Sequence, residues 1–458
     1  MTADELINMA IAEGIDVSSQ PASVPMSIDY TRSLKDYATA GEIASFLHAR
    51  KKSHHIYSNT LRKNGIVVKE DMGKYLASKD YINSGALKEA IKSPLHLFYA
   101  VESGWKDRLE AYEKSKNYFV LGEFIHQAIL EPRKFSRVVV EPGFKLNTKD
   151  GVKGLVSFWE DKLDQSQEED GAPDKEKIKN IVVQGGFDLD KMDGLKQYYA
   201  ALKAASGFQA IDEPNKLIVD IMYSNYRRYG DGLFFELLKH SKRETSIYYQ
   251  DPIYSIPQRI RPDAMQFEEN IGANTIISVK STRAESIGHF TYQTAKLCYE
   301  LSEGMYLDVA SAVTGRDFRS TIMIMVQTIP PFGIAAFVWD PEDLEIGKYK
   351  YRQALQTVAE CREKGLYPGY DAYAESGNFG LISMKQPEWN TKELHPVDIL
   401  NPHNMDKFLG QEQPEEDRWQ FIQDNADAIE EIGYTHRFTP EELAQKKESL
   451  AETSIEIN

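Results

Sequence analysis

Two short stretches decide the fold of this chain: QRIRPDAM at residues 258–265 and TIISVK at residues 275–280. Both are brief runs rich in β-branched and apolar residues with turn residues between them, which is typical of neighbouring strands. If the strands pair in antiparallel fashion, Asp263 and Lys280 come to lie side by side at one end of a sheet. A carboxylate there can bind Mg²⁺, and a lysine beside it can orient a water toward phosphorus.

The pattern on either side of these stretches predicts the rest of the architecture. Upstream, the chain is mostly helical from about residue 82 to 240, and the charged, Gly-containing segment 162–186 is expected to be an exposed insertion. Further elements are expected as a strand at 245–249, a helix at 289–314, strands at 319–328 and 333–338, and a helix at 340–364. This order predicts an α/β (α+β) fold with a central mixed β-sheet, containing residues 245–280 and 319–338, flanked by helices.

Composition limits the class of protein and the kind of metal site. Apolar residues make up 41% of the 458 residues and charged ones 27%, which is ordinary for globular proteins, and no uncharged apolar run reaches about 18 residues. The chain begins without a basic stretch followed by an apolar one, so we expect a cytoplasmic protein with no membrane partner. Only Cys298 and Cys361 are present, which excludes a four-cysteine metal site. Any metal must be held by oxygen and histidine.

Charge is unevenly distributed along the chain. The net charge is −16, which argues against a protein whose whole surface wraps nucleic acid. Residues 411–458 hold 13 acidic and 4 basic side chains. We therefore expect residues 391–458 to be an acidic, partly helical appendage outside the core. The charge of the remaining chain still allows a local basic groove.

The N-terminal region predicts a separate small module. Residues 1–37 are expected to be a linker with a short helical lead, and residues 38–79 a winged-helix-like module with helices at 39–47 and 58–66 and a hairpin from 67–69 and 74–77. The segment resembles the small winged helices appended to phage antirepressor-type proteins. The candidate DNA-binding cations here are Arg50, Lys51, Lys52, Arg62 and Lys63. The alternative is an ordinary solvated helical face.

Five motifs in the same order carry a resemblance to a known family. They are INSGALK at 82–88 with Ser93-Pro94, the Gly122 to His126 helix with Leu130-Glu131-Pro132, ETSIYY at 244–249 with Asp251-Pro252, RPD at 261–263, and VKST at 279–282. Over residues 80–390 the chain resembles the PD-(D/E)xK nuclease superfamily, specifically the exonuclease VIII (RecE-type) phage and prophage recombination exonucleases. The resemblance implies a restriction-endonuclease-like core, Mg²⁺ or Mn²⁺ as cofactor, and cleavage of linear duplex DNA ends to give single strands for recombination. It also implies a homo-oligomer and a single-strand annealing protein as partner.

The resemblance implies a role for each matching residue. His126 would be a metal ligand, Glu244 would hold a metal-bound water or a second ion, and Asp263 would be the main carboxylate ligand. Lys280 would position the nucleophilic water, and the carbonyl of Val279 would add a backbone oxygen. Taken alone, His126 would instead be interpreted as a buried, hydrogen-bonded histidine.

Two positions depart from the family pattern. Ser278 stands where the family has Asp or Glu, and Ser302 stands where it has glutamine. Either a carboxylate from elsewhere, with Glu300 and Glu303 as the nearest candidates, occupies the gap, or metal binding and cleavage are impaired. Two functions therefore stay open: a metal-dependent exodeoxyribonuclease, and a catalytically silent nuclease-fold protein that binds DNA or a recombination partner.

Overall fold

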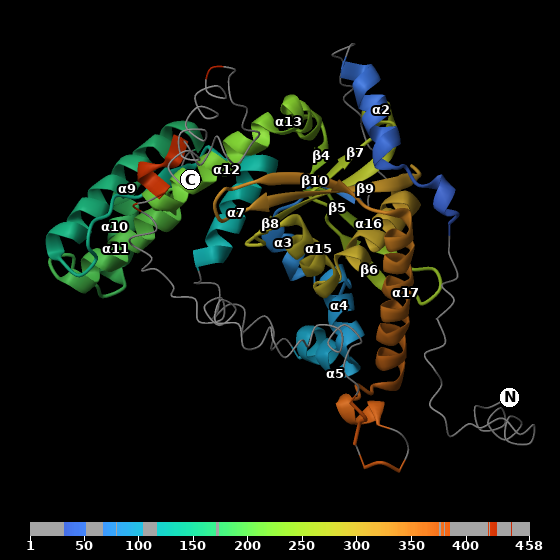
Figure 1. Ribbon diagram of the computed structural model, residues 1–458. Coiled ribbons are helices and arrows are strands. Elements are labelled where there is room, and N and C mark those ends of the chain that lie inside the picture. Colours follow the sequence, from blue (N-terminus) through green and yellow to red (C-terminus); the bar gives the residue numbers. More distant parts are fainter. Residues whose placement is uncertain are drawn as a thin grey trace, which may run out of the picture.

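A central mixed sheet flanked by helices confirms the predicted fold class (Figure 1). The computed structural model describes residues 32–51, 67–78, 80–103, 117–170, 174–374, 377–379, 381–384, 420, 422–427 and 441. In this described part of the chain, no helix is both long enough and apolar enough to cross a membrane.

Five strands form the central sheet in the order β10-β9-β8-β7-β4. They span Lys242–Arg243 (β4), Ala264–Gln266 (β7), Asn274–Thr282 (β8), Phe318–Gln327 (β9) and Ile334–Val338 (β10). Strands β8 and β9 pair in parallel and the other neighbours pair in antiparallel fashion, so the sheet is mixed. Residues 274–279 of β8 are all buried, because helices cover both faces of the strand. This is why the sequence there lacks a polar alternation.

A second sheet holds two strands that were expected to belong to the first, together with a strand from the N-terminal region. Strands β1 (Val67–Val68), β5 (Ser246–Gln250) and β6 (Pro257–Ile260) form it in the order β1-β5-β6. The prediction of a single sheet containing all of residues 245–280 is therefore wrong. The chain leaves β6 at Arg261 and enters β7 after Asp263, and Pro262 between them has no N–H to donate to a continuous ladder. The motif thus lies at the crossover between two sheets.

The predicted hairpin of the N-terminal module is also wrong. Residues Met72–Ala77 form helix α3, whose first turn is capped by the Asp71 side chain, and Val67 pairs with Ile247 of β5. Helix α2 (Ala40–Lys51) matches the first expected helix. The second expected helix, 58–66, lies outside the described residues, as do Lys52, Arg62 and Lys63.

Two helical layers cover the two faces of β8. The odd residues Ile277 and Val279 share a core with α7 (Asn117–Leu130), α12 (Glu213–Arg228) and α13 (Leu233–Lys239). The even residue Ile276 shares the other core with α4 (Ser84–Lys92), α16 (Tyr299–Thr314) and α17 (Pro341–Lys364). Since successive side chains of a strand alternate between faces, Ser278 and Lys280 lie on the α16 side.

The single helix expected at 289–314 is two helices. Helix α15 (Ile287–Lys296) ends before Leu297, and α16 begins after Cys298, whose φ is +48°. A left-handed residue cannot continue a right-handed helix, so the chain changes direction there. The remaining elements are η1 (Leu34–Asp36), α5 (Pro94–Leu97), η2 (Phe98–Glu102), α8 (Pro132–Phe135), η3 (Tyr229–Gly232), α14 (Glu268–Ile271) and η4 (Tyr370–Tyr373).

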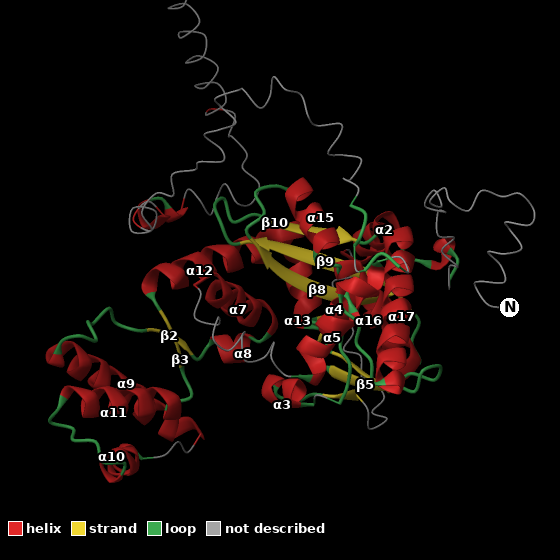
Figure 2. Ribbon diagram, turned by 90° about the horizontal axis from the view of Figure 1, so that it is seen from below, coloured by secondary structure: helices red, strands yellow, loops and turns green. Residues whose placement is uncertain are grey.

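A three-helix unit projects from the sheet core beside α7 and α12 (Figure 2). It consists of helices α9 (Lys149–Asp170), α10 (Lys175–Gln184) and α11 (Met192–Ala205). In the chain these helices lie between two short strands, β2 (Val138–Val140) and β3 (Gln209–Ile211), which pair in parallel. The expected exposed insertion at 162–186 is therefore wrong, because Leu163, Ile178 and Val182 are buried in the core of this unit. Each helix is apolar on one face only, and the many charged residues between the apolar ones make this helical repeat hard to recognise in the sequence.

The acidic appendage is not wholly outside the core. In the described part of residues 391–458, Ile422 is buried and Ala426 packs against the same core cluster as α7 and α12. These residues are four positions apart and therefore lie on one face of a helical turn. The expectation of a tail outside the core is wrong for this segment.

Candidate active site

Three potential metal ligands from separate elements converge at the crossover between the sheets. His126 lies on α7, Glu244 between β4 and β5, and Asp263 between β6 and β7. His126 Nε2 lies 3.3 Å from Asp263 Oδ1, and His126 Nδ1 lies 3.8 Å from Glu244 Oε1. One ligand atom from each residue lies within 4.8 Å of the other two. The predicted proximity of His126 and Asp263 is therefore confirmed.

A close helix-to-strand approach carries His126 to this point. A Cβ placed on Gly122 would lie 2.7 Å from Ser281 Oγ, a distance that real Cβ atoms do not adopt. Glycine at position 122 thus lets α7 pack directly on β8. His126 follows one helical turn later and lies on the same face.

Glu244 is held by Arg261 and presents its second oxygen to His126. Its backbone has φ +50°, its side chain is buried, and its Oε2 accepts a hydrogen bond of 2.8 Å from Arg261 Nε. Oε1 has no hydrogen-bond partner among the described residues. Burial raises the pKa of Glu244, and the Arg261 guanidinium opposes that rise.

Asp263 and Lys280 form the ion pair that the strand spacing predicts. Pairing of Ala264 with Ile277 in β7 and β8 places Asp263 Oδ2 3.8 Å from Lys280 Nζ. The N–H of Val279 donates to the same Oδ2 at 2.6 Å. Burial alone would raise the pKa of Asp263, but the charges of Lys280 and His126 lower it well below its usual range. Burial lowers the pKa of Lys280, yet Asp263 and Glu303 raise it overall, so its side chain is an ammonium at neutral pH.

A carboxylate from α16 lies directly against Ser278. The Ser278 hydroxyl donates to Glu303 Oε1 at 2.7 Å, and Glu303 Oε2 has no hydrogen-bond partner among the described residues. Glu303 is 1% exposed, and burial raises its pKa to about 7. Glu300 turns elsewhere and pairs with Lys350 Nζ at 2.5 Å. Of the two candidates, Glu303 is therefore the one that lies beside the substituted position, while the neighbouring Ser302 is buried on the same helix.

Sequence reasoning assigned no role to two residues of this site, Lys88 and Tyr299. Lys88 Nζ, from α4, lies 4.8 Å from the centroid of the Tyr299 ring, and Lys280 Nζ lies 5.6 Å from the same centroid. Burial and the nearby Lys280 charge lower the pKa of Lys88 to about 8. A lysine within a helical motif gives no signal of such a partner, because the ring comes from a distant part of the chain.

Other predicted site residues are not tested by this geometry. Arg50 and Lys51 lie at the end of α2, where only the backbone is described. The carbonyl of Val279 remains a predicted ligand, since what the structure shows is its N–H bound to Asp263.

The donor set fits a hard divalent cation. Mg²⁺ and Mn²⁺ prefer carboxylate oxygens, and imidazole is compatible with Mn²⁺ and similar ions. Two buried carboxylate oxygens, Glu244 Oε1 and Glu303 Oε2, lack hydrogen-bond partners within the described chain. An unsatisfied buried carboxylate oxygen is costly, and a cation would satisfy it.

Comparisons with individual known proteins find only loose similarity. A search of curated proteins finds no match. A crystal structure of a protein from Eubacterium rectale, provisionally named an exonuclease, is 10% identical with a TM-score of 0.36, covering 73% of this chain and 99% of that chain. That likeness is too loose to carry an argument.

The sequence profile of a PDDEXK-like domain of unknown function matches residues 84–377, which is more than half of the chain. His126, Glu244, Asp263, Lys280 and Glu303 all lie within the matched range. The match confirms the expected relationship at the level of the PD-(D/E)xK superfamily, whereas the narrower resemblance to exonuclease VIII stays a prediction. On this evidence the chain belongs to the family of PDDEXK-like domains of unknown function (DUF3799).

Proposed function

We propose that this protein is a divalent-metal-dependent exodeoxyribonuclease that hydrolyses phosphodiester bonds at the ends of linear duplex DNA. The observation that carries the proposal is the convergence of His126, Glu244 and Asp263 within 4.8 Å, beside the Lys280 ammonium. The nuclease-like family supports the same chemistry. Mg²⁺ is the proposed cofactor and Mn²⁺ its substitute.

In this proposal, some residues of the site hold a cation and others orient the reactants. A bound divalent cation would supply Lewis-acid stabilisation of the phosphoryl oxygens and a lower pKa for a bound water. His126, Glu244 and Asp263 would hold it, and the Val279 N–H keeps the Asp263 carboxylate in place. As an ammonium, Lys280 donates hydrogen bonds, so it would orient the attacking water and stabilise the developing negative charge rather than act as a base.

Lys88 and Glu303 complete this proposed centre from the helical side. Lys88 would bring a second positive charge toward the phosphate, since it shares the Tyr299 ring with Lys280. Glu303 would supply the negative charge that the family places at position 278. A carboxylate at this point supports the active enzyme over the catalytically silent alternative.

The biological setting follows from the resemblance and is also proposed. Digestion of one strand from a duplex end would give single strands for recombination, and a single-strand annealing protein would take them up. A homo-oligomeric ring would let an acidic protein surround DNA, with its basic residues turned inward.

The test compares end-labelled linear duplex DNA with the same sequence as a covalently closed circle. We expect the protein with Mg²⁺ or Mn²⁺ to release labelled nucleotides from the linear form only, and EDTA to stop the reaction. Asp263→Asn should abolish release, whereas Asp193→Asn, a matched change at an exposed position of α11, should not. Cleavage of the circle would indicate an endonuclease instead. Absence of cleavage from both substrates would support the silent, DNA-binding alternative.

A further inference from the structure

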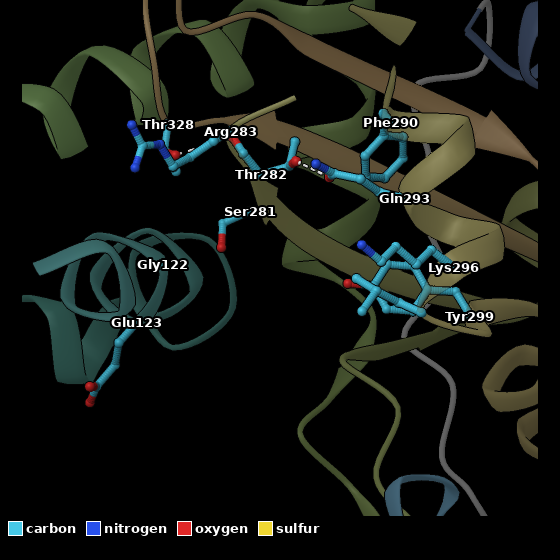
Figure 3. A pocket seen from close by; sticks show the side chains of 11 residues that line it. Gly122, Glu123, Ser281, Thr282, Arg283, Phe290, Gln293, Lys296, Tyr299 and Thr328 are labelled. Carbon is cyan, nitrogen blue, oxygen red and sulfur yellow. Dashed lines mark hydrogen bonds between the residues drawn. The ribbon is translucent and has the colours of Figure 1, made fainter. Parts of the chain in front are cut away.

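A cavity of about 550 Å³ lies next to the candidate active site. Figure 3 shows side chains that line it. It is lined by Gly122 and Glu123 of α7, by Ser281, Thr282 and Arg283 at the end of β8, by Phe290, Gln293 and Lys296 of α15, and by Leu297, Tyr299 and Thr328. Ser281 follows Lys280 in the chain, and the Tyr299 ring lies near the Lys280 ammonium. The cavity therefore opens beside the lysine that would orient the nucleophile.

The lining presents two cations whose charge is not neutralised by an ion pair. Arg283 and Lys296 are exposed, and neither is within ion-pair distance of a carboxylate in the described part of the chain. Among the lining residues the one carboxylate is Glu123, which accepts a hydrogen bond from Gln127 at 3.2 Å. Its side chain points away from Ser281 in Figure 3. This local charge contrasts with the net charge of −16 and favours an anionic ligand such as a phosphate.

An exposed aromatic ring lies on α15, outside the residues that line the cavity. Tyr292 is 66% exposed on α15 and lies four residues before Lys296, so both side chains are on one face of the helix. Basic groups that follow a phosphate backbone, together with aromatic rings on which bases stack, characterise single-strand binding without sequence preference. Stacking on Tyr292 would not depend on which base is present.

The size of the cavity selects between a duplex and a single strand. Cavities of roughly 300–1,000 Å³ accommodate small ligands, and 550 Å³ is therefore room for one or two nucleotides rather than a double helix. The polar groups inside are already partly occupied, since Thr282 Oγ1 donates to Gln293 Oε1 at 2.7 Å. The wall of the cavity is therefore not suited to recognise one base over another.

We infer that the cavity is a subsite for a single-stranded DNA segment. Arg283 and Lys296 contact successive phosphates in it, and Tyr292, which lies outside the lining on the same helix face as Lys296, stacks on a base of that segment. The choice of ligand rests on the proposed function, because the segment would be the strand that leads to the scissile bond beside Lys280.

The test measures DNA binding without cleavage. Full-length protein is titrated into a fluorescein-labelled oligo(dT) of 12 nucleotides in EDTA, over a range of salt concentrations. Arg283→Glu/Lys296→Glu should weaken binding at least tenfold and reduce the slope of log affinity against log salt by about 1.4, because each single-strand phosphate contact contributes about 0.7. The matched control Lys177→Glu/Lys179→Glu, two exposed positions of α10, makes the same charge change and should alter affinity less than twofold.

Two further arms separate the possible explanations. Tyr292→Ala should weaken oligo(dT) binding about fivefold with no change in the salt slope, because stacking does not depend on counterion release. A blunt-ended duplex should lose less than threefold affinity in the Arg283→Glu/Lys296→Glu variant. Equal losses for duplex and single strand would overturn the assignment to a single strand.

Unchanged oligo(dT) affinity in the charge-reversal variant would overturn the subsite altogether. If that variant melts below the natural protein, Arg283→Gln/Lys296→Gln replaces it, and the same loss of salt slope is expected. Failure of the proposed hydrolysis is distinguishable, since a protein that cleaves nothing but binds oligo(dT) through Arg283 and Lys296 would keep the subsite and lose the nuclease. If the protein cleaves DNA but its affinity for oligo(dT) does not change when Arg283 and Lys296 are replaced, the nuclease is kept and the subsite is lost.

Discussion

Lys280 lies between two acidic regions that the fold treats differently. On one side, Asp263 and Glu244 are paired with Lys280, His126 and Arg261. On the other, Glu303 receives one neutral hydrogen bond from Ser278 and has a second oxygen without a partner in the described structure. The pKa of Asp263 is accordingly lowered, whereas burial raises that of Glu303 to about 7. At Asp263 the charges of Lys280 and His126, with the hydrogen bonds from His126 and the Val279 N–H, outweigh burial, whereas at Glu303 burial outweighs the charges of Lys280 and Lys88 and the Ser278 hydrogen bond. Burial also raises the pKa of Glu244, so the contrast is between Asp263 and Glu303.

This contrast indicates what each region needs from a cation. Asp263 is already ionised in the protein alone and can accept a metal at any physiological pH. Glu303 is held near the midpoint of its titration, and an added positive charge would favour its ionised form. We expect the first region to supply most of the affinity for a cation and the second to gain charge only once a cation is present.

The largest expected effect comes from removing the charge of Glu303. If Glu303 takes the place of the missing strand carboxylate, Glu303→Gln should lower the rate of linear-duplex cleavage about a thousandfold, which corresponds to about 4 kcal/mol of transition-state stabilisation. Glu300→Gln is the matched control on the same helix, because Glu300 pairs with Lys350 and not with Ser278. It should change the rate by less than threefold. Equal losses in both variants, measured as initial rates at saturating Mg²⁺, would contradict a specific role for Glu303.

The next effect concerns stability and has opposite signs in the two regions. Glu303 has a folded pKa of about 7 against an ordinary value of 4.5, so the natural protein loses stability as pH rises between these values. At 1.36 kcal/mol per pH unit, Glu303→Gln should therefore stabilise the metal-free protein by about 3 kcal/mol at pH 8 and by little at pH 4.5. Asp263 has a lowered pKa, so Asp263→Asn should destabilise at pH 8, and the loss should shrink only in strong acid.

Urea unfolding in EDTA at pH 5 and pH 8 measures both changes. A Glu303→Gln variant that is less stable than the natural protein at pH 8 would place Glu303 in the same class as Asp263. The comparison between the two regions would then fail, whatever the activity of the variants.

Sequence alone predicted the first region better than the second. Asp263 and Lys280 lie on neighbouring strands at a spacing that antiparallel pairing brings together, and His126 entered through an ordered set of motifs. Strand spacing was enough for Asp263 and Lys280, whereas the role of His126 was implied only by the resemblance to a known family. The separate three-stranded sheet was missed because the alternation of β5 and β6 is the same whichever sheet they join, and only Pro262 marks the crossover.

Glu303 could be named from the sequence as a candidate but could not be distinguished from Glu300. The two residues lie three positions apart, so a small rotation of α16 would exchange which one faces β8. That rotation depends on the break at Cys298, which the periodicity did not predict. Lys88 was missed for a similar reason, since its distance to Tyr299 depends on how α4 packs against α16.

The smallest expected effect returns the carboxylate to the strand. Ser278→Asp places a second acid against Glu303 in a buried setting, where like charges raise each other's pKa and the pair cannot both ionise easily. We expect the cleavage rate to fall about tenfold, equivalent to about 1.4 kcal/mol. The double variant Ser278→Asp/Glu303→Gln keeps one carboxylate at the family's usual position and a neutral acceptor on α16, so it should cleave faster than either single variant. Initial rates for all four proteins at one Mg²⁺ concentration decide this. A Ser278→Asp protein that is faster than the natural one would mean that the position is still short of negative charge and that Glu303 does not fill it.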